Sequence, residues 1–193
     1  MPSPFLYYAD HRLSVAELTA ARLDGHVVEL GDAYIPADAV ETAALRAGSL
    51  RDILGTVLAA THLSAAWIHD AVADPPPRHT VQRAVPRRLH HVLGRRFRYR
   101  DAMIPPQHLT VVGGVNVTDR VRTLVDLARE GDDAHGAAAA AMTNRWPGLA
   151  EEALALIAAS GPFPGKRPAA GLIARLSAER TVGSQDEVTR YTS

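Results

Sequence analysis

Cysteine is absent from this sequence of 193 residues, and several kinds of chemistry are excluded with it. Without thiols there are no disulfides, thiolate nucleophiles or cysteine-ligated zinc or iron–sulfur sites. Lysine is nearly absent too, because Lys166 is its one occurrence among 21 basic residues. The chain also lacks the roughly 18 consecutive apolar residues of a membrane span, and the polar run at residues 10–12 interrupts any signal peptide. We therefore expect a cytoplasmic protein that does not enter a membrane.

Net charge is also absent, since 21 basic residues balance 21 acidic ones, but the charges are segregated along the chain. Residues 1–74 carry four Arg and ten carboxylates, and residues 75–100 carry eight Arg and no carboxylate. Residues 101–193 carry nine basic and eleven acidic residues. A local excess of guanidinium groups suits phosphate or carboxylate ligands, to which Arg makes forked contacts. The segment 75–100 is therefore the first candidate for a binding site.

The N-terminal 40 residues predict a helix followed by a β-hairpin. Ser14 and Glu17 form a capping-box pattern that starts a helix, and Asp24-Gly25 is typical of its end. Two short β-rich runs at 26–30 and 33–36 are separated by Gly31-Asp32, a two-residue hairpin signal. A helix followed by a hairpin is the second half of a winged helix-turn-helix. We expect Leu18, Leu23, Val27, Leu30 and Tyr34 to dock this segment on the main body.

The rest of the chain predicts a mixed α+β domain with a small sheet. Apolar periodicity and turn residues predict helices at about 45–58, 63–72, 119–129, 133–145, 149–159 and 168–180, and strands at about 79–85, 89–93, 95–99, 108–112 and 115–117. Residues 181–193 are polar and without periodicity, which indicates a loose tail. We therefore expect a truncated winged helix-turn-helix-like segment at 1–40, a mixed α/β domain at 41–180 and a tail at 181–193.

A row of arginines is the strongest local feature. Side chains alternate between the two faces of a strand, so Arg96, Arg98 and Arg100 should project together while Phe97 and Tyr99 point to the core. The candidate phosphate-binding set is Arg78, Arg83, Arg87, Arg88, Arg95, Arg96, Arg98 and Arg100. Such a cationic patch would bind DNA phosphates and release counterions. The alternative is that these arginines pair with the acidic N-terminal part of the same chain.

No constellation of residues predicts catalysis, a metal or a cofactor. His62 and His69 lie seven residues apart, and adjacent His90 and His91 would face opposite sides of a strand. The acidic pair of a nucleotidyltransferase, the acid-and-lysine pattern of a restriction-type nuclease, the Gly-x-Ser-x-Gly elbow and the P-loop are all missing. We expect His69 to be a hydrogen-bonded core residue. We expect Arg122 and Asp126, four apart on a helix, to form a surface pair worth a few tenths of a kcal/mol.

Four runs together resemble the AbiEi family, the antitoxins of type IV toxin–antitoxin systems. The runs are Leu18–Gly25 with Gly31–Tyr34, Leu63–His69, Val112–Thr118 and Arg122–Arg129. The resemblance implies an N-terminal winged helix-turn-helix, a C-terminal mixed domain and binding to inverted repeats in operator DNA of the protein's own operon, by a dimer or by two cooperating monomers. It also implies opposition to a nucleotidyltransferase-like toxin. From the missing catalytic motifs we expect neither a cofactor nor enzymatic activity.

The sequence departs from this family at its start. Only about a dozen residues precede the capping box at Ser14, so we expect a truncated winged helix-turn-helix. Residues 1–40 carry two Arg and six carboxylates, a net charge of −4 where DNA-reading segments are usually basic. Arg22 is the one basic residue between Leu13 and Pro36, and it is the candidate to contact bases. The alternative function is a protein-interaction module that has lost DNA binding.

Overall fold

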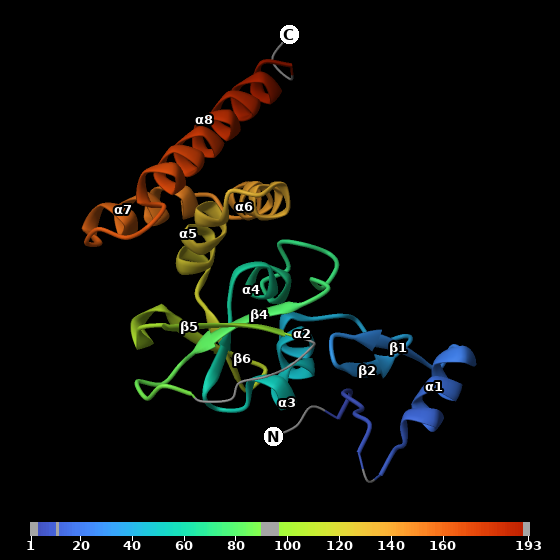
Figure 1. The fold of residues 1–193 in the computed structure, drawn as a ribbon. Helices are drawn as coiled ribbons and strands as arrows, with labels where there is room; N and C mark the ends of the chain where they lie inside the picture. Colours follow the sequence, from blue (N-terminus) through green and yellow to red (C-terminus); the bar gives the residue numbers. More distant parts are fainter. Residues whose placement is uncertain (1–3, 11, 90–96, 191–193) are drawn as a thin grey trace. The chain divides into compact units, whose positions relative to one another are not determined.

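The structure is a computed structural model that describes residues 4–10, 12–89 and 97–190, and it is an α+β protein. The chain divides into two compact units, Met1–Thr118 and Asp119–Ser193. This boundary differs from the expected division at residues 40 and 180. The N-terminal segment belongs to the first unit because Leu6, Leu30 and Ile35 join its hydrophobic core. Each unit is described separately below (Figure 1).

The predicted helix and hairpin are confirmed in the first unit. Helix α1 (Val15–Leu23) starts with the Ser14–Glu17 capping box, in which each residue's side chain bonds to the other's backbone N–H. Strands β1 (Val27–Leu30) and β2 (Ala33–Pro36) pair antiparallel around a two-residue turn. Gly31 in this turn has φ +58°, and a Cβ there would lie 2.4 Å from the Ser49 Oγ. The turn therefore requires glycine for both its conformation and its packing.

The five-stranded sheet of the first unit has the order β5-β4-β3-β7-β6. Its elements are α2 (Ala43–Ser49), α3 (Arg51–Leu54), β3 (Leu58–Ala60), α4 (His62–Ile68), β4 (His79–Arg83), β5 (Phe97–Met103), the 3₁₀ helix η1 (Pro106–His108), β6 (Leu109–Val112) and β7 (Val115–Thr118). Strand β3 is antiparallel to β4 and parallel to β7, β4 is parallel to β5, and β6 is antiparallel to β7. The expected strand at 89–93 falls largely outside the described residues.

The central strand β3 corrects the sequence prediction, which extended a helix to Leu58. All three of its residues are buried, so they show no alternation of apolar and polar side chains. Leu and Ala are also not strand-favouring residues. The core on this sheet contains fully buried Leu50, Trp67, Ile68, Val81 and Val117.

The docking prediction for the N-terminal segment is confirmed for Leu30, which joins the hydrophobic core of the first unit, whereas for Leu18 and Val27 the structure shows burial alone. Leu18, Val27 and Leu30 are buried, and Tyr34 is half-buried. Leu23 contradicts the prediction, because its side chain is 77% exposed at the end of α1. Helix α1 buries one residue, Leu18, so most of its surface faces solvent.

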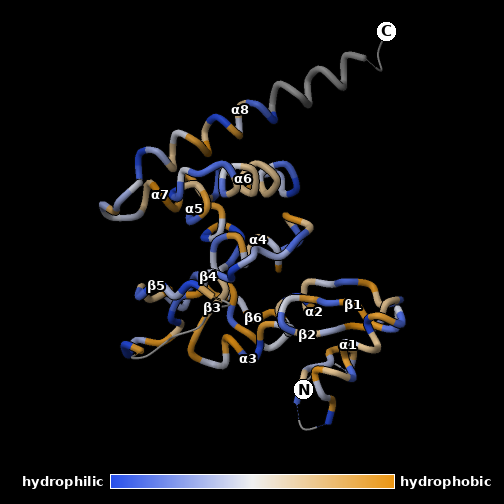
Figure 2. Tube along the Cα trace, turned by 45° about the vertical axis from the view of Figure 1, so that its right-hand side comes forward, coloured by the Kyte–Doolittle hydropathy of each residue, from blue (hydrophilic) through white to orange (hydrophobic). Residues whose placement is uncertain are grey.

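The second unit consists of helices in its described part: α5 (Arg120–Glu130), α6 (Asp133–Arg145), α7 (Leu149–Ala159) and α8 (Lys166–Arg190). Asp119 and Asp132 cap α5 and α6 as the sequence indicates. Leu124, Leu127, Met142 and Ile173 are fully buried between these helices. Figure 2 shows hydrophilic and hydrophobic residues alternating along α8, as expected for a helix with one packed face.

The predicted loose tail is a second correction, since α8 continues to Arg190. The segment 181–190 contains no proline that would end the helix. Residues 191–193 lie outside the described part. None of the described helices is both long enough and apolar enough to cross a membrane.

Candidate nucleic-acid interface

Strands β4 and β5 bring the arginine-rich segment to one edge of the sheet. They pair in parallel from His79 opposite Phe97 to Arg83 opposite Met103, with a register shift before Arg83. Strand β5 is the outermost strand of the sheet, and among the residues that the structure describes no further strand pairs with its other side. We call the end of β4, the described residues 84–89 after it and the whole of β5 the β4–β5 edge.

The predicted alternation of side chains holds from Phe97 to Tyr99, but Arg100 departs from it because its Nε is buried. Phe97 and Tyr99 pack against the hydrophobic core. Arg98 is exposed and lies opposite Thr80 in the pairing register, and partly buried Arg100 lies opposite Gln82. Arg95 and Arg96 lie outside the described residues, so the row is described at Arg98 and Arg100. In the same segment, Arg78, Arg87 and Arg88 are exposed.

The edge contains a carboxylate that the sequence prediction left out. Strand β5 continues past Arg100 to Asp101, whose Oδ1 lies 3.2 Å from Arg83 Nε and whose Oδ2 lies 3.8 Å from Arg88 Nε. The Tyr99 hydroxyl donates a hydrogen bond to Asp101 Oδ1 at 3.1 Å. Burial and this bond raise the pKa of the Tyr99 hydroxyl above its usual value. Residues 75–101 therefore carry eight Arg and one Asp, a net charge of +7.

Arg83 serves the fold rather than the exposed surface. Besides its ion pair with Asp101, its Nη1 donates to the backbone carbonyls of Val85 and Pro86. Arg78 donates to the Phe97 carbonyl at 3.2 Å and so crosses from the start of β4 to β5. Of the predicted phosphate-binding arginines, Arg83 is committed to internal partners. The sequence left open that the arginines pair with acidic residues of the N-terminal part. Arg83 and Arg88 instead form ion pairs with Asp101.

Arg22, the predicted base-contacting residue, lies in the last turn of α1. Its Nη1 lies 3.5 Å from Glu29 Oε1 on β1, and both side chains are about half exposed. The ion pair links the helix to the hairpin, so Arg22 already has an acidic partner within the N-terminal segment. A contact with DNA would have to replace this partner.

Several buried polar residues escaped the sequence analysis. Arg46 of α2 is buried, donates to the Trp67 carbonyl at 2.7 Å and pairs with Asp70 at 3.1 Å and with Glu41. Its guanidinium carbon lies 5.6 Å from the centre of the Trp67 ring. These contacts tie α2 to α4. No sequence signal identified them, because the partners are far apart in the chain.

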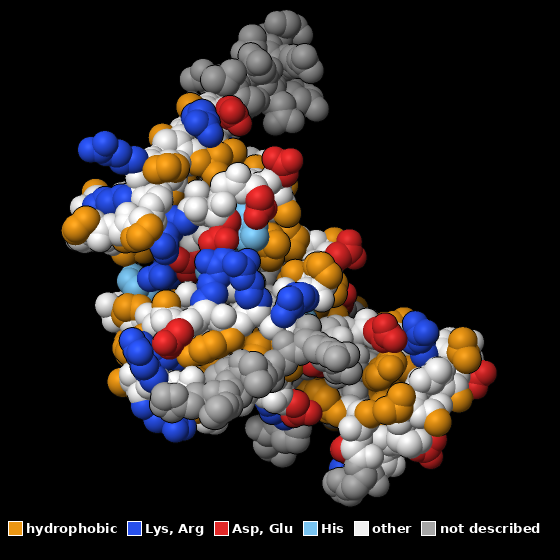
Figure 3. Space-filling view, viewed as in Figure 1, with side chains coloured by type: hydrophobic (Ala, Val, Ile, Leu, Met, Phe, Trp, Pro, Cys, Tyr) orange, Lys and Arg blue, Asp and Glu red, His pale blue; other side chains and the backbone are white. Residues whose placement is uncertain are grey.

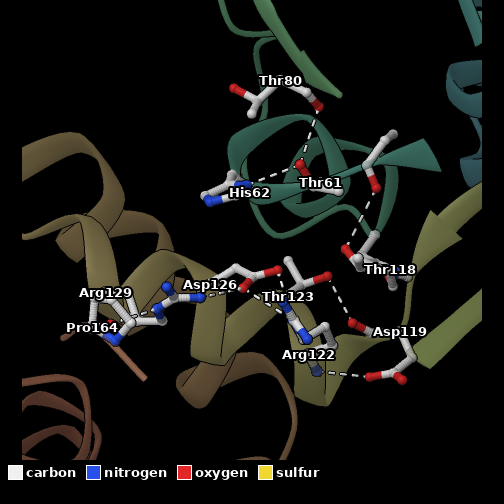
Figure 4. Close-up of polar contacts among 12 residues, drawn as sticks. Thr61, His62, Thr80, Thr118, Asp119, Arg122, Thr123, Asp126, Arg129 and Pro164 are labelled. Carbon is white, nitrogen blue, oxygen red and sulfur yellow. Dashed lines mark hydrogen bonds and ion pairs between the residues drawn. The ribbon is translucent and has the colours of Figure 1, made fainter. Parts of the chain in front are cut away.

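A Ser–His contact in the first unit is structural. Ser64 Oγ lies 3.2 Å from His79 Nδ1 and accepts a hydrogen bond from the Thr80 backbone N–H at 3.0 Å. Ser64 is fully buried, so no substrate reaches its hydroxyl. Burial lowers the pKa of His79, which favours the neutral imidazole. Figure 4 shows the neighbouring bonds of Thr61 to Thr80 and to His62, which complete the polar layer where β3 meets α4.

His69 fits its predicted role. Its Nε2 lies 2.7 Å from the Thr118 carbonyl oxygen, so this ring nitrogen donates, although the residue is half-buried rather than fully buried. Within the described ranges, no group of three His, Asp or Glu side chains is arranged to hold a metal ion.

Arg122 and Asp126 in the second unit form a buried pair, which corrects the predicted surface pair. Arg122 Nε lies 3.0 Å and 2.9 Å from the two carboxylate oxygens of Asp126, whose side chain is 1% exposed. Arg129 approaches the same carboxylate at 3.5 Å. Figure 4 shows these side chains along α5, to the left of the Asp119 cap that accepts from the Arg122 backbone N–H. The spacing was right, but the packing of α5 buries the acid.

Comparison of this chain with protein-family models and with curated proteins finds no match in either.

Proposed function

We propose that this chain is an AbiEi-like antitoxin and autorepressor that binds operator DNA through the β4–β5 edge and opposes a nucleotidyltransferase-like toxin in the cytoplasm. The observation that carries the proposal is the net charge of +7 over residues 75–101. Of the described members of this set, Arg98, Arg100 and Asp101 lie on the outer strand β5, and Arg78, Arg83, Arg87 and Arg88 lie on β4 or beside it. Exposed guanidinium groups of Arg78, Arg87, Arg88 and Arg98 suit phosphate oxygens.

The four runs that resemble the family give the second support, because they fall on elements that build the fold. The runs cover α1 with the turn of the hairpin, α4, the tight turn between β6 and β7, and α5. In the β6–β7 turn, Gly113 has φ +56° and a Cβ there would lie 2.3 Å from the Ala44 carbonyl oxygen. The resemblance therefore includes at least one position, Gly113, with a strict packing requirement.

A gel-shift titration with a fragment of the protein's own promoter tests the proposal. About four neutralised phosphates predict that the logarithm of affinity falls with the logarithm of salt concentration with a slope of about −4. Arg98→Ala should weaken binding to all sequences similarly and reduce this slope by about one, because phosphate contacts carry little base information. Arg175→Ala on α8 removes an exposed arginine from the second unit and serves as the matched control.

The titration also separates the two functions that the sequence left open. Absent binding, or a flat response to salt, would contradict the DNA proposal and favour a protein-interaction module. If the protein does bind DNA, a binding-site selection assay tests Arg22. Unchanged selected sequences in Arg22→Ala would mean that α1 does not read bases. An effect of Arg175→Ala as large as that of Arg98→Ala would move the contact away from the β4–β5 edge.

A further inference from the structure

The outer face of helix α1 is apolar and exposed, which is unusual for so short a helix. Val15, Ala16, Thr19, Ala20 and Leu23 share one face that spans about 140° around the helix axis. Val15 is 65% and Leu23 77% exposed, and Ala16 and Ala20 are exposed between them. The Thr19 hydroxyl donates to the Val15 carbonyl at 2.7 Å, so this residue needs no further polar partner. We call these five residues the outer face of α1.

This composition argues against contact of the outer face with DNA. A helix that reads DNA presents cationic or polar side chains to phosphates and base edges, and none of these five side chains is charged or carries an amide. The small residues Ala16 and Ala20, four apart, instead leave room for the ridge of another helix between Val15 and Leu23. The chemistry of the face therefore fits a helix from a protein partner.

The charges beside the face specify the sign of that partner. Glu17 and Asp24 lie along one flank of the face, and residues 1–40 carry a net charge of −4. Ser14 holds the Glu17 carboxylate with two hydrogen bonds, at 2.7 Å and 2.8 Å, which lower its pKa. Arg22 on the opposite flank is paired with Glu29. Two copies of this chain joined through the outer faces would bring like charges together, which disfavours a symmetric dimer.

We infer that the outer face of α1 docks a basic amphipathic helix of another protein, with its apolar stripe on Val15 and Leu23 and its Lys or Arg side chains toward Glu17 and Asp24. Figure 3 shows orange side chains over the N-terminal helix and hairpin, with red carboxylates beside them. A helix of nine residues offers a small contact area, so the complex belongs to the weak, transient class. This surface is separate from the β4–β5 edge and does not depend on the proposed DNA function.

A designed peptide tests this inference with the full chain. The probe is a fluorescein-labelled helix of about 16 residues made of Leu, Ala and Lys, with an apolar stripe at spacing i, i+3, i+4, i+7. In fluorescence anisotropy we expect saturable binding with a Kd on the order of 10–100 μM. The same peptide with every Lys replaced by Glu should bind at least about tenfold more weakly, as should a scrambled Lys peptide without the stripe.

Matched variants locate the site. Leu23→Asp should weaken binding of the Lys peptide about tenfold, while Val111→Asp, at a residue that is 70% exposed on β6, should leave it unchanged. Ala20→Lys is the second variant if Leu23→Asp loses helix content in circular dichroism. Equal binding of the scrambled peptide, or no effect of either α1 variant, would overturn the inference. A dimer in sedimentation that Leu23→Asp dissociates would overturn the inference in favour of a second copy of the chain. Loss of promoter binding in Leu23→Asp would overturn it in favour of DNA.

Discussion

Asp126 of the second unit and His79 of the first unit are both buried titratable side chains, and their surroundings stabilise them in opposite ways. In the second unit Asp126 is 1% exposed and meets Arg122 at 2.9 Å and Arg129 at 3.5 Å. In the first unit His79 is 5% exposed and meets the hydroxyl of Ser64 at 3.2 Å. The carboxylate lies between two guanidinium groups, whereas the imidazole has a neutral partner.

The difference follows from what lies within reach of each group. Transfer of a charge out of water is costly unless opposite charges and hydrogen bonds replace the solvent. Helix α5 supplies two arginines at spacings of four and three from Asp126. Burial lowers the pKa of His79. The negative charge of Asp32 favours the protonated imidazole, but burial outweighs it. The Asp126 site therefore depends on a charge pair, and the His79 site depends on the absence of charge.

Removal of Asp126 should have the largest effect on stability. Asp126→Ala leaves Arg122 without its carboxylate in a partly buried site, and loss of one member of a buried pair costs about 3–5 kcal/mol. Urea denaturation followed by circular dichroism at 222 nm should show this loss. Glu152→Ala, at an exposed acid on α7, should change stability by less than about 0.5 kcal/mol. A small effect of Asp126→Ala would mean that water reaches Arg122 and that the pair behaves as the surface pair which the sequence predicted.

Loss of the neutral partner in the first unit should have a smaller effect. Ser64→Ala leaves both His79 Nδ1 and the Thr80 backbone N–H without the hydroxyl that they share, which costs about 1–3 kcal/mol in a buried site. The same denaturation measurement applies. Ser177→Ala is the control, because the Ser177 hydroxyl bonds to Glu151 on the surface. If the two variants are equally stable, the buried network contributes little, and the contrast between the units concerns charge alone.

Local chemistry predicted much of the fold. The Ser14–Glu17 capping box and the Gly31-Asp32 turn depend on neighbouring residues, and both appear as expected. The start of α5 at Asp119 follows from the same kind of signal. Strand β3 was missed because Leu58–Ala60 are all buried and carry no strand preference of their own. Its identity comes from pairing with β4 and β7, which no local pattern reveals.

The candidate site was predictable only within single elements. Alternation along β5 placed Arg98 opposite to Tyr99, because that depends on strand geometry alone. The ion pair between Arg83 and Asp101 joins residues that are distant in the chain, and it required the parallel pairing of β4 with β5. The burial of Asp126 likewise depends on how the helices pack around α5. The sequence spacing identified Arg122 as the partner of Asp126, but it underestimated what the pair contributes to stability.

The pH dependence of stability should show the smallest effect and the sharpest contrast between the units. Because the pKa of His79 is lowered by burial, the unfolded chain binds a proton at His79 near pH 6.5 while the folded chain does not. Stability therefore rises with pH between the folded pKa and about 6.5, and it is lost as the solution is acidified through that range. One such group contributes a slope of at most about 1.4 kcal/mol per pH unit.

His79→Gln should remove this part of the slope in urea denaturation between pH 5 and 7.5, whereas His26→Gln, at an exposed residue, should leave it unchanged. Asp32→Asn should extend the loss to lower pH, because it removes the carboxylate that favours protonated His79. An unchanged slope in His79→Gln would show that His79 has the same pKa in the folded and the unfolded chain, which would contradict the expected effect of burial on this imidazole.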